Sequence, residues 1–551
     1  MDAKIHTELA LNFFEGHPLS KPPFFRAPLY PLFLRIIIGL FEYNPLILTV
    51  IQSLLGILSV IILSLIVYEI TENNYLFLIT AFISAFHWPF IYYEGEILIE
   101  TFYIFLVLLF HLFIFKGLKS NNKYYILFSG FIAGLSAITR PNILIVLLAY
   151  LLIIAFAKNY RRYFSFFMIP LAAPIFVITF INYIYGKDTL LISSQAGINF
   201  YIGNNRFSDG CSAVYPEGRQ DWWGGYIDSF RIAEEELNRE LKPSEVSRFW
   251  FKKALLDIKS YPLVWLKTLF RKTLFFINNF EISNNSPIYY FKDLSRVMHL
   301  PLLSFGIIFT FSIVGLFFIR RYIFSTFIFS YVILYSFSVI AFFVNSRYRL
   351  PVVPFFIILA ACGIYNILEV LKLNEYKIFV RYILICFISM VITFNNWYNV
   401  GPHPYEHYNI IGDIYREKNK FLEALKYYNL SLKVERYNNP AWVNLGVTLM
   451  ELKNYDIAEE IFKKALKFSK KESYLYSNLG IIYYNKNDFK TSRDYFLQAL
   501  TLDKNNEMSY LYLYKIYNEQ NDYAQAEFYL KIYNRLSTEP YEKKFYSRFM
   551  D

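Results

Sequence analysis

Charged residues and cysteines are both scarce in this chain of 551 residues. Asp, Glu, Lys and Arg make up 18% of it, against about a quarter in soluble domains, whereas 56% of the residues are hydrophobic. The three cysteines, Cys211, Cys362 and Cys386, lie far apart, and two of them fall in apolar runs. This spacing excludes a disulfide framework and a cysteine metal cluster. The composition favours a membrane protein.

Ten apolar segments have about the length that crosses a bilayer, roughly 17–25 residues. They are residues 47–70, 75–93, 97–115, 123–139, 142–157, 163–185, 300–319, 323–344, 350–371 and 378–396. The stretch 28–42 is apolar but shorter, and it contains Arg35, a pattern typical of an amphipathic helix at the membrane surface. The segments together predict an all-α, polytopic membrane bundle.

Basic residues cluster in four short loops, residues 116–123, 158–162, 320–321 and 372–377. Ten spans put all four loops on one side, which the positive-inside rule identifies as cytoplasmic. The net charge of +11 therefore needs no nucleic-acid partner. The other side receives residues 1–46, the long loop 186–299 and everything after residue 396, including the acidic first loop.

The first residues lack the basic stretch, apolar core and cleavage site of a signal peptide. Because the acidic first loop nevertheless falls on the outer side, we expect a further transmembrane helix to precede Met1. Such a helix would anchor the segment that begins with Asp2.

After Trp397 the composition changes, and a repeat begins. Small residues recur every 34 residues at Ala424, Ala458, Ser492 and Ala526, which is the period of tetratricopeptide repeats. We expect four repeats to form a solenoid with a continuous core. Such solenoids are mostly binding surfaces, and a spacer or a dimerisation module is the open alternative.

Four arginines lie at the ends of apolar segments on the predicted outer side, where positive charge is normally rare: Arg26, Arg140, Arg347 and Arg349. A guanidinium group offers a planar fork of donors that fits phosphate oxygens in pairs. The group is therefore predicted to bind the phosphate of a lipid-linked substrate. The alternative is that each arginine snorkels to lipid headgroups.

Several segments on this side occur in a recognisable order. They are DAKIHTELALNFFEGHPLSKPPFFRAPLYP, YYEGEILIETFYIF, GLSAITRPN, SSQAGINFYIGNN and NSRYRLPVVP. In them the chain resembles the polyprenyl-phosphate-sugar-dependent glycosyltransferases of the GT-C type, such as bacterial protein O-mannosyltransferases and aminoarabinose transferases. The resemblance covers most of residues 1–400. It implies transfer of a sugar from a polyprenyl-phosphate carrier at the outer face of a bacterial plasma membrane.

The resemblance also implies roles for acidic residues. Asp2 matches the general base of the first outer loop, which would make an acceptor hydroxyl or amine more nucleophilic. Glu96 matches the acidic residue of the second outer loop, with Glu94 as the alternative, and either would place the acceptor or a divalent metal ion. Glu100 belongs to the same acidic element, because Glu96 and Glu100 are four residues apart and share a face on a helix. The other interpretation is that Glu100, which enters the apolar run, pairs with a polar group of a neighbouring helix. Whether a metal ion is needed stays open.

Two asparagines complete the candidate site. Asn204 and Asn205 lie in a loop rich in Gly and Asn, and their amides are predicted to contact the sugar or the acceptor. A turn-rich connector is the other interpretation.

The sequence thus predicts five regions. They are a first outer loop with surface helices (1–46), N-terminal membrane helices (47–185), an extracytoplasmic loop subdomain (186–299), C-terminal membrane helices (300–396) and a tetratricopeptide repeat domain (397–551). The expected function is a membrane glycosyltransferase whose repeats recruit a protein or glycan acceptor, or a partner. A membrane-anchored scaffold without catalysis, or a transporter of lipid-linked sugars, is the alternative.

Overall fold

A computed structural model describes residues 2–11, 21–213, 222–283, 288–322, 324–399, 404–469 and 472–536, with residues 541 and 545. The chain divides into two compact units, Met1–Gly401 and Pro402–Phe549 apart from the last two residues. Within the described residues the regular structure is helical, and no strand occurs beyond an isolated bridge between His87 and Leu303. The predicted all-α class is confirmed.

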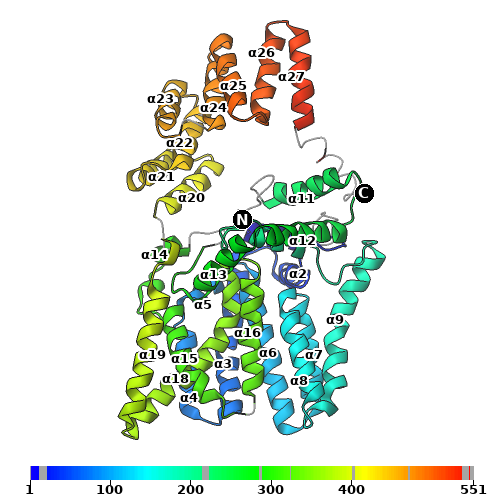
Figure 1. The fold of residues 1–551 in the computed structure, drawn as a ribbon, viewed down its shortest axis with the longest axis vertical. Coiled ribbons are helices and arrows are strands. Elements are labelled where there is room, and N and C mark those ends of the chain that lie inside the picture. The colour runs from blue at the N-terminus through cyan, green and yellow to red at the C-terminus, as the bar shows by residue number, and fades with distance from the viewer. Residues whose placement is uncertain are drawn as a thin grey trace. The chain divides into compact units, whose positions relative to one another are not determined.

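The first unit is a bundle in which five helical segments are long and apolar enough to cross a membrane, judged by length and composition. They are Pro45–Thr71, Ile99–Ser120, Arg161–Ile184, Ser346–Lys372 and Tyr376–Asn399. Shorter apolar helices lie among them (Figure 1). The bundle helices are α3 (Pro45–Thr71), α4 (Asn74–Ala85), α6 (Ile99–Ser120), α7 (Lys123–Ala137), α8 (Leu144–Phe156), α9 (Phe164–Ile184), α15 (Phe305–Ile319), α16 (Ser325–Ile340), α18 (Val353–Lys372) and α19 (Tyr376–Phe394).

All ten predicted segments contain a helix, but the second is broken. Residues 75–93 form α4 and the short α5 (Trp88–Glu94), separated at His87. Pro89 has no N–H to continue α4, so the helix ends before it. The backbone of Leu303 fills the break: its N–H donates to the carbonyl of Phe86 at 2.7 Å, and its carbonyl accepts from Trp88 N at 3.2 Å. The break turns α5 away from α4 and directs its C-terminal residue, Glu94, toward α3.

Glycines allow the bundle helices to approach each other closely. A Cβ atom on Gly315 of α15 would lie 1.7 Å from the carbonyl oxygen of Leu359 on α18. On α7, a Cβ on Gly130 would lie 2.3 Å from the carbonyl oxygen of Phe167, at the start of α9. Since lipid and side chain are equally apolar, membrane helices associate through such close packing rather than through hydrophobic burial.

Shorter helices lie at one end of the bundle (Figure 1). They are α1 (Asp2–Leu11), α2 (Leu29–Phe41), α10 (Ala196–Asn204), α11 (Trp222–Leu237), α12 (Pro243–Ser260), α13 (Pro262–Ile277) and α14 (Ile288–Leu294). The stretch predicted as an amphipathic surface helix is α2, which exposes Ile36, Leu40 and Phe41. The long loop 186–299 supplies the helices from α10 to α14. The candidate site is at this end.

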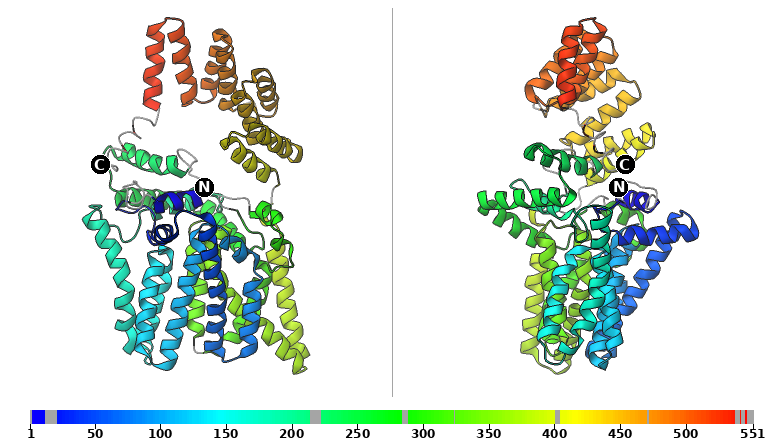
Figure 2. Two further views of the ribbon diagram at one scale, coloured as in Figure 1. Left: turned by 180° about the vertical axis from the view of Figure 1, so that it is seen from behind. Right: turned by 90° about the vertical axis from the view of Figure 1, so that its right-hand side faces the viewer.

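The second unit is a solenoid of four helix pairs. Its helices are α20 (Pro404–Glu417), α21 (Phe421–Val434), α22 (Asn439–Glu451), α23 (Tyr455–Leu466), α24 (Ser473–Asn485), α25 (Phe489–Leu502), α26 (Glu507–Glu519) and α27 (Tyr523–Leu536). Figure 2 shows the pairs from two further sides. The four small residues of the repeat are all buried, because each lies where the helices of a pair meet. The predicted repeats are confirmed.

Candidate active site

A buried carboxylate joins two of the four predicted arginines. Glu100 lies in the first turn of α6 and is fully buried. Its Oε1 accepts hydrogen bonds from Arg140 Nη2 at 2.8 Å and from Arg347 Nε at 2.5 Å. Arg140 follows α7, and Arg347 belongs to the short helix α17 (Ser346–Arg349). Three segments that are distant in sequence therefore converge in one ion cluster, which we call the Glu100 triad.

The triad carries more positive than negative charge in a buried position. Its two guanidinium groups converge on one carboxylate oxygen. Glu100 Oε2 and Arg140 Nη1 are buried and have no hydrogen bond of good geometry among the described residues, although the Tyr335 hydroxyl lies near the Arg140 guanidinium. Buried polar atoms in folded proteins are nearly always paired. An anionic group that accepts from Arg140 would satisfy its open N–H.

Aromatic rings surround the Arg140 guanidinium. Its centre is 5.7 Å from the ring centroid of Tyr103 and 5.0 Å from that of Tyr348. Rings at these distances stabilise a cation through their quadrupoles and keep water away from it. A desolvated cation interacts more strongly with an anion than an exposed one does.

Arg349 is engaged differently, although it is only two residues from Arg347. Its Nη1 donates to the carbonyls of Phe276 and Asn278, at 2.9 and 2.6 Å, and its Nη2 is 2.7 Å from Glu281 Oε1. These contacts explain its burial without any ligand. They fasten the segment after α13 to the bundle, so the geometry gives no support to the predicted phosphate contact of Arg349.

Arg26 is half-buried in the segment that precedes α2. The backbone around it is fixed at two points: Phe24 N donates to Asn182 Oδ1 at 3.0 Å, and Leu29 N donates to the carbonyl of Ile138 at 3.4 Å. Ile138 is two residues before Arg140. The first loop therefore passes beside the end of α7 where the triad lies, as the predicted site requires.

Asp2 is the first residue of α1, and its side chain lies outside the described part of the structure. The described half of α1 is at the same end of the bundle, since the His6 ring packs edge-on against Tyr30 of α2 at 5.1 Å. Tyr30 in turn donates to Gln52 Oε1 at 2.7 Å, and Gln52 Nε2 donates to the carbonyl of Glu96 at 2.5 Å. The helix that begins with Asp2 is thus connected to the second acidic loop.

Glu96 is half-buried near the triad. Burial raises the pKa of its carboxyl group, while a hydrogen bond from Tyr92 and the positive charge of Arg347 act in the opposite direction. The loop is held in place by Tyr93, whose hydroxyl is 2.6 Å from Ser346 Oγ, next to Arg347. The geometry therefore brings Glu96 into the electrostatic field of the triad.

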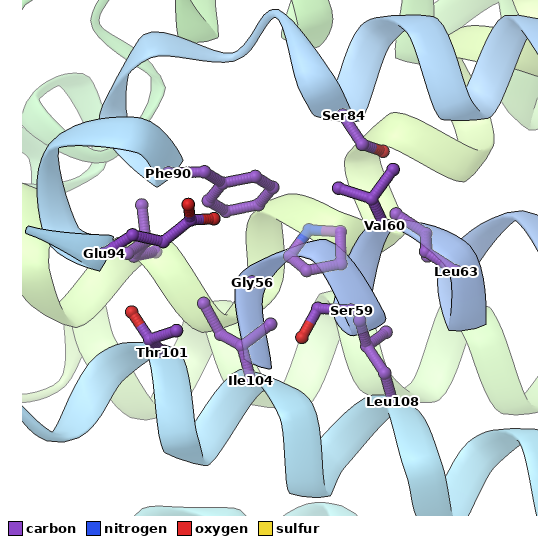
Figure 3. A pocket seen from close by; sticks show the side chains of 12 residues that line it. Gly56, Ser59, Val60, Leu63, Ser84, Phe90, Glu94, Thr101, Ile104 and Leu108 are labelled. Carbon is purple, nitrogen blue, oxygen red and sulfur yellow. The ribbon is translucent and has the colours of Figure 1, made fainter. Parts of the chain in front are cut away.

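Glu94 faces elsewhere, into a pocket between α3, α5 and α6 (Figure 3). Burial raises the pKa of its carboxyl group to about 7. The sequence suggested Glu94 and Glu96 as alternatives for one role, but the structure gives them different surroundings.

The two asparagines are occupied within the fold. Asn204 Nδ2 donates to the carbonyls of Phe200 and Ala341, and its Oδ1 accepts from Trp265 Nε1 and Lys272 Nζ. Asn205 Nδ2 donates to two carbonyls of α10, and its Oδ1 accepts from the backbone of Phe207. These bonds fix the end of α10, and they leave the predicted contact with sugar or acceptor without geometric support.

Among the described residues, no group of three or more His, Cys, Asp or Glu side chains could hold a metal ion. Glu100, which sequence reasoning considered beside Glu96 as half of an acidic pair, instead accepts from two arginines. The sequence did contain a signal for this role, because a carboxylate inside an apolar run needs a partner. It contained no signal for which cation the partner would be.

Three models of known families match parts of the chain. Residues 20–185 match a family model described as dolichyl-phosphate-mannose-protein mannosyltransferase. Two models described as tetratricopeptide repeat match residues 405–438 and 437–505. The predicted resemblance is confirmed over these segments, and the first match indicates a membrane glycosyltransferase of the mannosyltransferase type.

Solved structures match the chain over limited shares. The first repeat domain of Spaghetti, bound to an HSP90 peptide, is 20% identical and covers 21% of this chain and 94% of that chain, with a TM-score of 0.21. A crystal structure of MamA is 22% identical and covers 24% and 73%, with a TM-score of 0.22. PilF of Pseudomonas aeruginosa is 16% identical and covers 34% and 84%, with a TM-score of 0.24. These TM-scores support no conclusion about function. No curated protein sequence matches the chain.

Proposed function

We propose that this protein transfers a sugar from a polyprenyl-phosphate carrier to an acceptor at the outer face of a bacterial plasma membrane. The observation that carries the proposal is the Glu100 triad, in which two buried arginines share one carboxylate and one buried N–H lacks a hydrogen bond of good geometry. Two of its three residues, Glu100 and Arg140, lie within residues 20–185, which match the family model.

The arginines would stabilise the departing phosphate. When the bond between the anomeric carbon and the phosphate oxygen breaks, the electron pair stays with the carrier phosphate, whose negative charge grows. Arg140 and Arg347 are already oriented by Glu100, so they need no reorganisation as this charge develops. Arg26 is the third candidate ligand of the phosphate, since its segment passes beside the same helix end.

A base would act on the acceptor. The acceptor oxygen or nitrogen forms the new bond to the anomeric carbon on the face opposite the phosphate, and its proton passes to a carboxylate. By resemblance this base is Asp2, and Glu96 would position the acceptor from the second loop. The leaving phosphate is already an anion, so no general acid is required. Whether a divalent metal ion takes part in the transfer is tested by the assay with chelator.

The repeat unit would bring the acceptor or a partner protein to the membrane unit. Because it is tethered to the membrane unit by a short link, any ligand of the solenoid is held at a raised local concentration. Protein hydroxyls, glycolipids and polysaccharide are all chemically suitable acceptors.

The test is sugar transfer by the purified full chain, supplied with radiolabelled polyprenyl-phosphate sugars with and without chelator. We expect Arg347→Ala and Asp2→Asn to reduce transfer by about a hundredfold or more, the scale seen when a charge-stabilising group or a general base is removed. Arg321→Ala, in a basic loop of the opposite predicted face, is the matched control. If the wild type transfers no sugar, the alternative of a membrane-anchored scaffold without catalysis is favoured. Passage of intact lipid-linked sugar across vesicles would indicate a transporter.

A further inference from the structure

The pocket that receives Glu94 has a chemical character of its own. It lies between α3, α4, α5 and α6, with residues 350–354 closing it (Figure 3). Most of its wall is apolar, from residues such as Val60, Leu63, Phe90, Ile104 and Leu108. Its polar lining consists of Glu94, Ser59, Ser84 and Thr101.

Glycine at position 56 makes room for the carboxylate. A Cβ atom there would lie 2.0 Å from Glu94 Oε1, which no side chain could tolerate without moving the carboxylate. Glycine within a helix costs about 1 kcal/mol relative to alanine. The sequence therefore places a destabilising residue at the one point of α3 where the carboxylate enters.

When Glu94 is ionised, the polar groups of the pocket accept hydrogen bonds and do not donate them. A hydroxyl has one proton, and each pocket hydroxyl donates it to a backbone carbonyl: Ser59 to Leu55, Ser84 to Thr80 and Thr101 to Tyr93, at 2.7, 2.7 and 3.2 Å. The ionised carboxylate of Glu94 is also an acceptor. A ligand that satisfies these groups must therefore be a hydrogen-bond donor, and a cation will be preferred.

We propose that this pocket binds a primary aliphatic amine in its protonated form, with the ammonium group on the Glu94 carboxylate and the alkyl chain along the apolar wall. An anion would be repelled by Glu94 and would find no donor. A hydrocarbon without a polar group would leave a half-buried carboxylate without a partner, which is unfavourable. The proposal does not depend on sugar transfer, because the pocket is lined by none of the triad residues.

Binding should depend on pH in one direction. None of the residues that α3, α4, α6 and the segment 350–354 contribute to the lining is titratable, and α5 contributes Glu94. The pKa of Glu94 is raised to about 7 by burial, while an aliphatic amine keeps its proton to about pH 10, like a lysine side chain. The affinity should therefore rise about fivefold between pH 6 and pH 7 and about tenfold between pH 6 and pH 8, and level off above pH 8, as Glu94 becomes ionised.

The experiment measures binding of octylamine, octanol and octanoate to the purified full chain by isothermal titration calorimetry. We expect octylamine to bind at least tenfold more tightly than the other two, and Glu94→Gln to remove this preference. Glu72→Gln is the matched control, since Glu72 is an exposed carboxylate at the far end of α3. Equal affinities for the three probes, or an unchanged preference in Glu94→Gln, would overturn the proposal.

The pH series on the wild type stands even if the variant does not fold, and an affinity that is flat from pH 6 to pH 8 would also overturn the proposal. Nanodiscs distinguish the source of the amine. If phosphatidylethanolamine weakens octylamine binding relative to phosphatidylcholine, the natural ligand is a lipid amine, and equal binding in both assigns the pocket to a free amine. A neutral isoprenoid alcohol that binds as tightly as octylamine would show that the pocket takes a lipid chain instead.

Discussion

In the bundle, the side chains of Arg347 and Glu100 form an ion pair with exposed fractions of 7% and 0%, whereas in the repeat unit Lys463 and Glu459 pair with 50% and 16% exposed. The distances, 2.5 and 2.6 Å, are nearly equal. The difference lies in the surroundings: the first pair has no water to replace a lost partner, and the second has. The loss of one partner from an ion pair of the same length therefore has different consequences in the two units. Four predictions test how the two units differ, in their ion pairs and in their helix packing.

The largest effect is expected for Glu100→Gln. Removing one partner of a buried ion cluster leaves uncompensated charge, here on the guanidinium group of Arg140, and costs about 3–5 kcal/mol. We expect a lower unfolding temperature of the bundle and loss of any sugar transfer, both measured on the full chain in detergent. Glu69→Gln is the control, since Glu69 pairs with Lys116 and Lys119 at the bundle's other end. Equal stability of the two variants would remove the contrast between buried and solvated pairs.

The next effect concerns helix packing within the bundle. Gly315→Ala would place a methyl group 1.7 Å from the backbone carbonyl of Leu359, and backbone cannot rotate away as a side chain can. We expect a loss of about 1–3 kcal/mol, the usual cost of overpacking, and separation of α15 from α18. Thermal unfolding measures the loss of stability. A cysteine cross-link between α15 and α18 measures their separation. Unchanged values for both would contradict the packing argument.

A smaller effect is expected at the corresponding position of the solenoid. In Gly446→Ala the new Cβ would meet the ring of Phe462 at 2.5 Å, and a ring can move. Alanine also favours the helix by about 1 kcal/mol, so the net change should stay below about 1 kcal/mol in either direction. Hydrogen exchange of α22 and α23 in the full chain measures it. A loss equal to that of Gly315→Ala would show that the two units tolerate methyl groups equally badly.

The smallest effect is expected for Lys486→Ala in the solenoid. Lys486 Nζ contacts Asp456 and Glu459 at 2.8 Å, but it is partly exposed, and such pairs contribute roughly 0.2–1 kcal/mol. Burial tends to raise the pKa of Glu459, yet hydrogen bonds from Lys463, Lys486 and Tyr483 lower it to about 2. The stability from these pairs is therefore present above about pH 5 and is lost as the pH falls toward 2.

Hydrogen exchange of the solenoid over this pH range measures that loss. The variant should show a weaker dependence on pH than the wild type between pH 5 and pH 2. Identical pH profiles would indicate that Lys486 contributes nothing to the low pKa of Glu459.

Sequence reasoning succeeded where structure is local. Each repeat of the solenoid packs against its neighbours in the chain, so the period of small residues from Ala424 to Ala526 was enough to predict it. The apolar runs likewise predicted the ten helical segments, because length and hydropathy are properties of one segment. It missed the break at His87, although Pro89 is a local signal for it. The pairing of that break with Leu303 could not be predicted, because Leu303 is distant in the chain.

The candidate site was partly foreseen. The arginines and acids were selected by residue type and by their common side, and the Glu100 triad does join two of those arginines. The partners were not foreseen, because Glu100 and Arg347 meet only when three segments fold together. The contrast between Arg347 and Arg349 shows the same limit, as two neighbouring residues of one type face different surroundings.

The sequence by itself determined that this protein has an apolar helical bundle and a repeat solenoid, because both follow from periods and lengths within single segments. The tertiary structure alone decided that Glu100 joins two arginines while Glu94, six residues earlier, enters an apolar pocket. The physical reason is that the state of a buried charge depends on which atoms surround it, and those atoms come from distant parts of the chain.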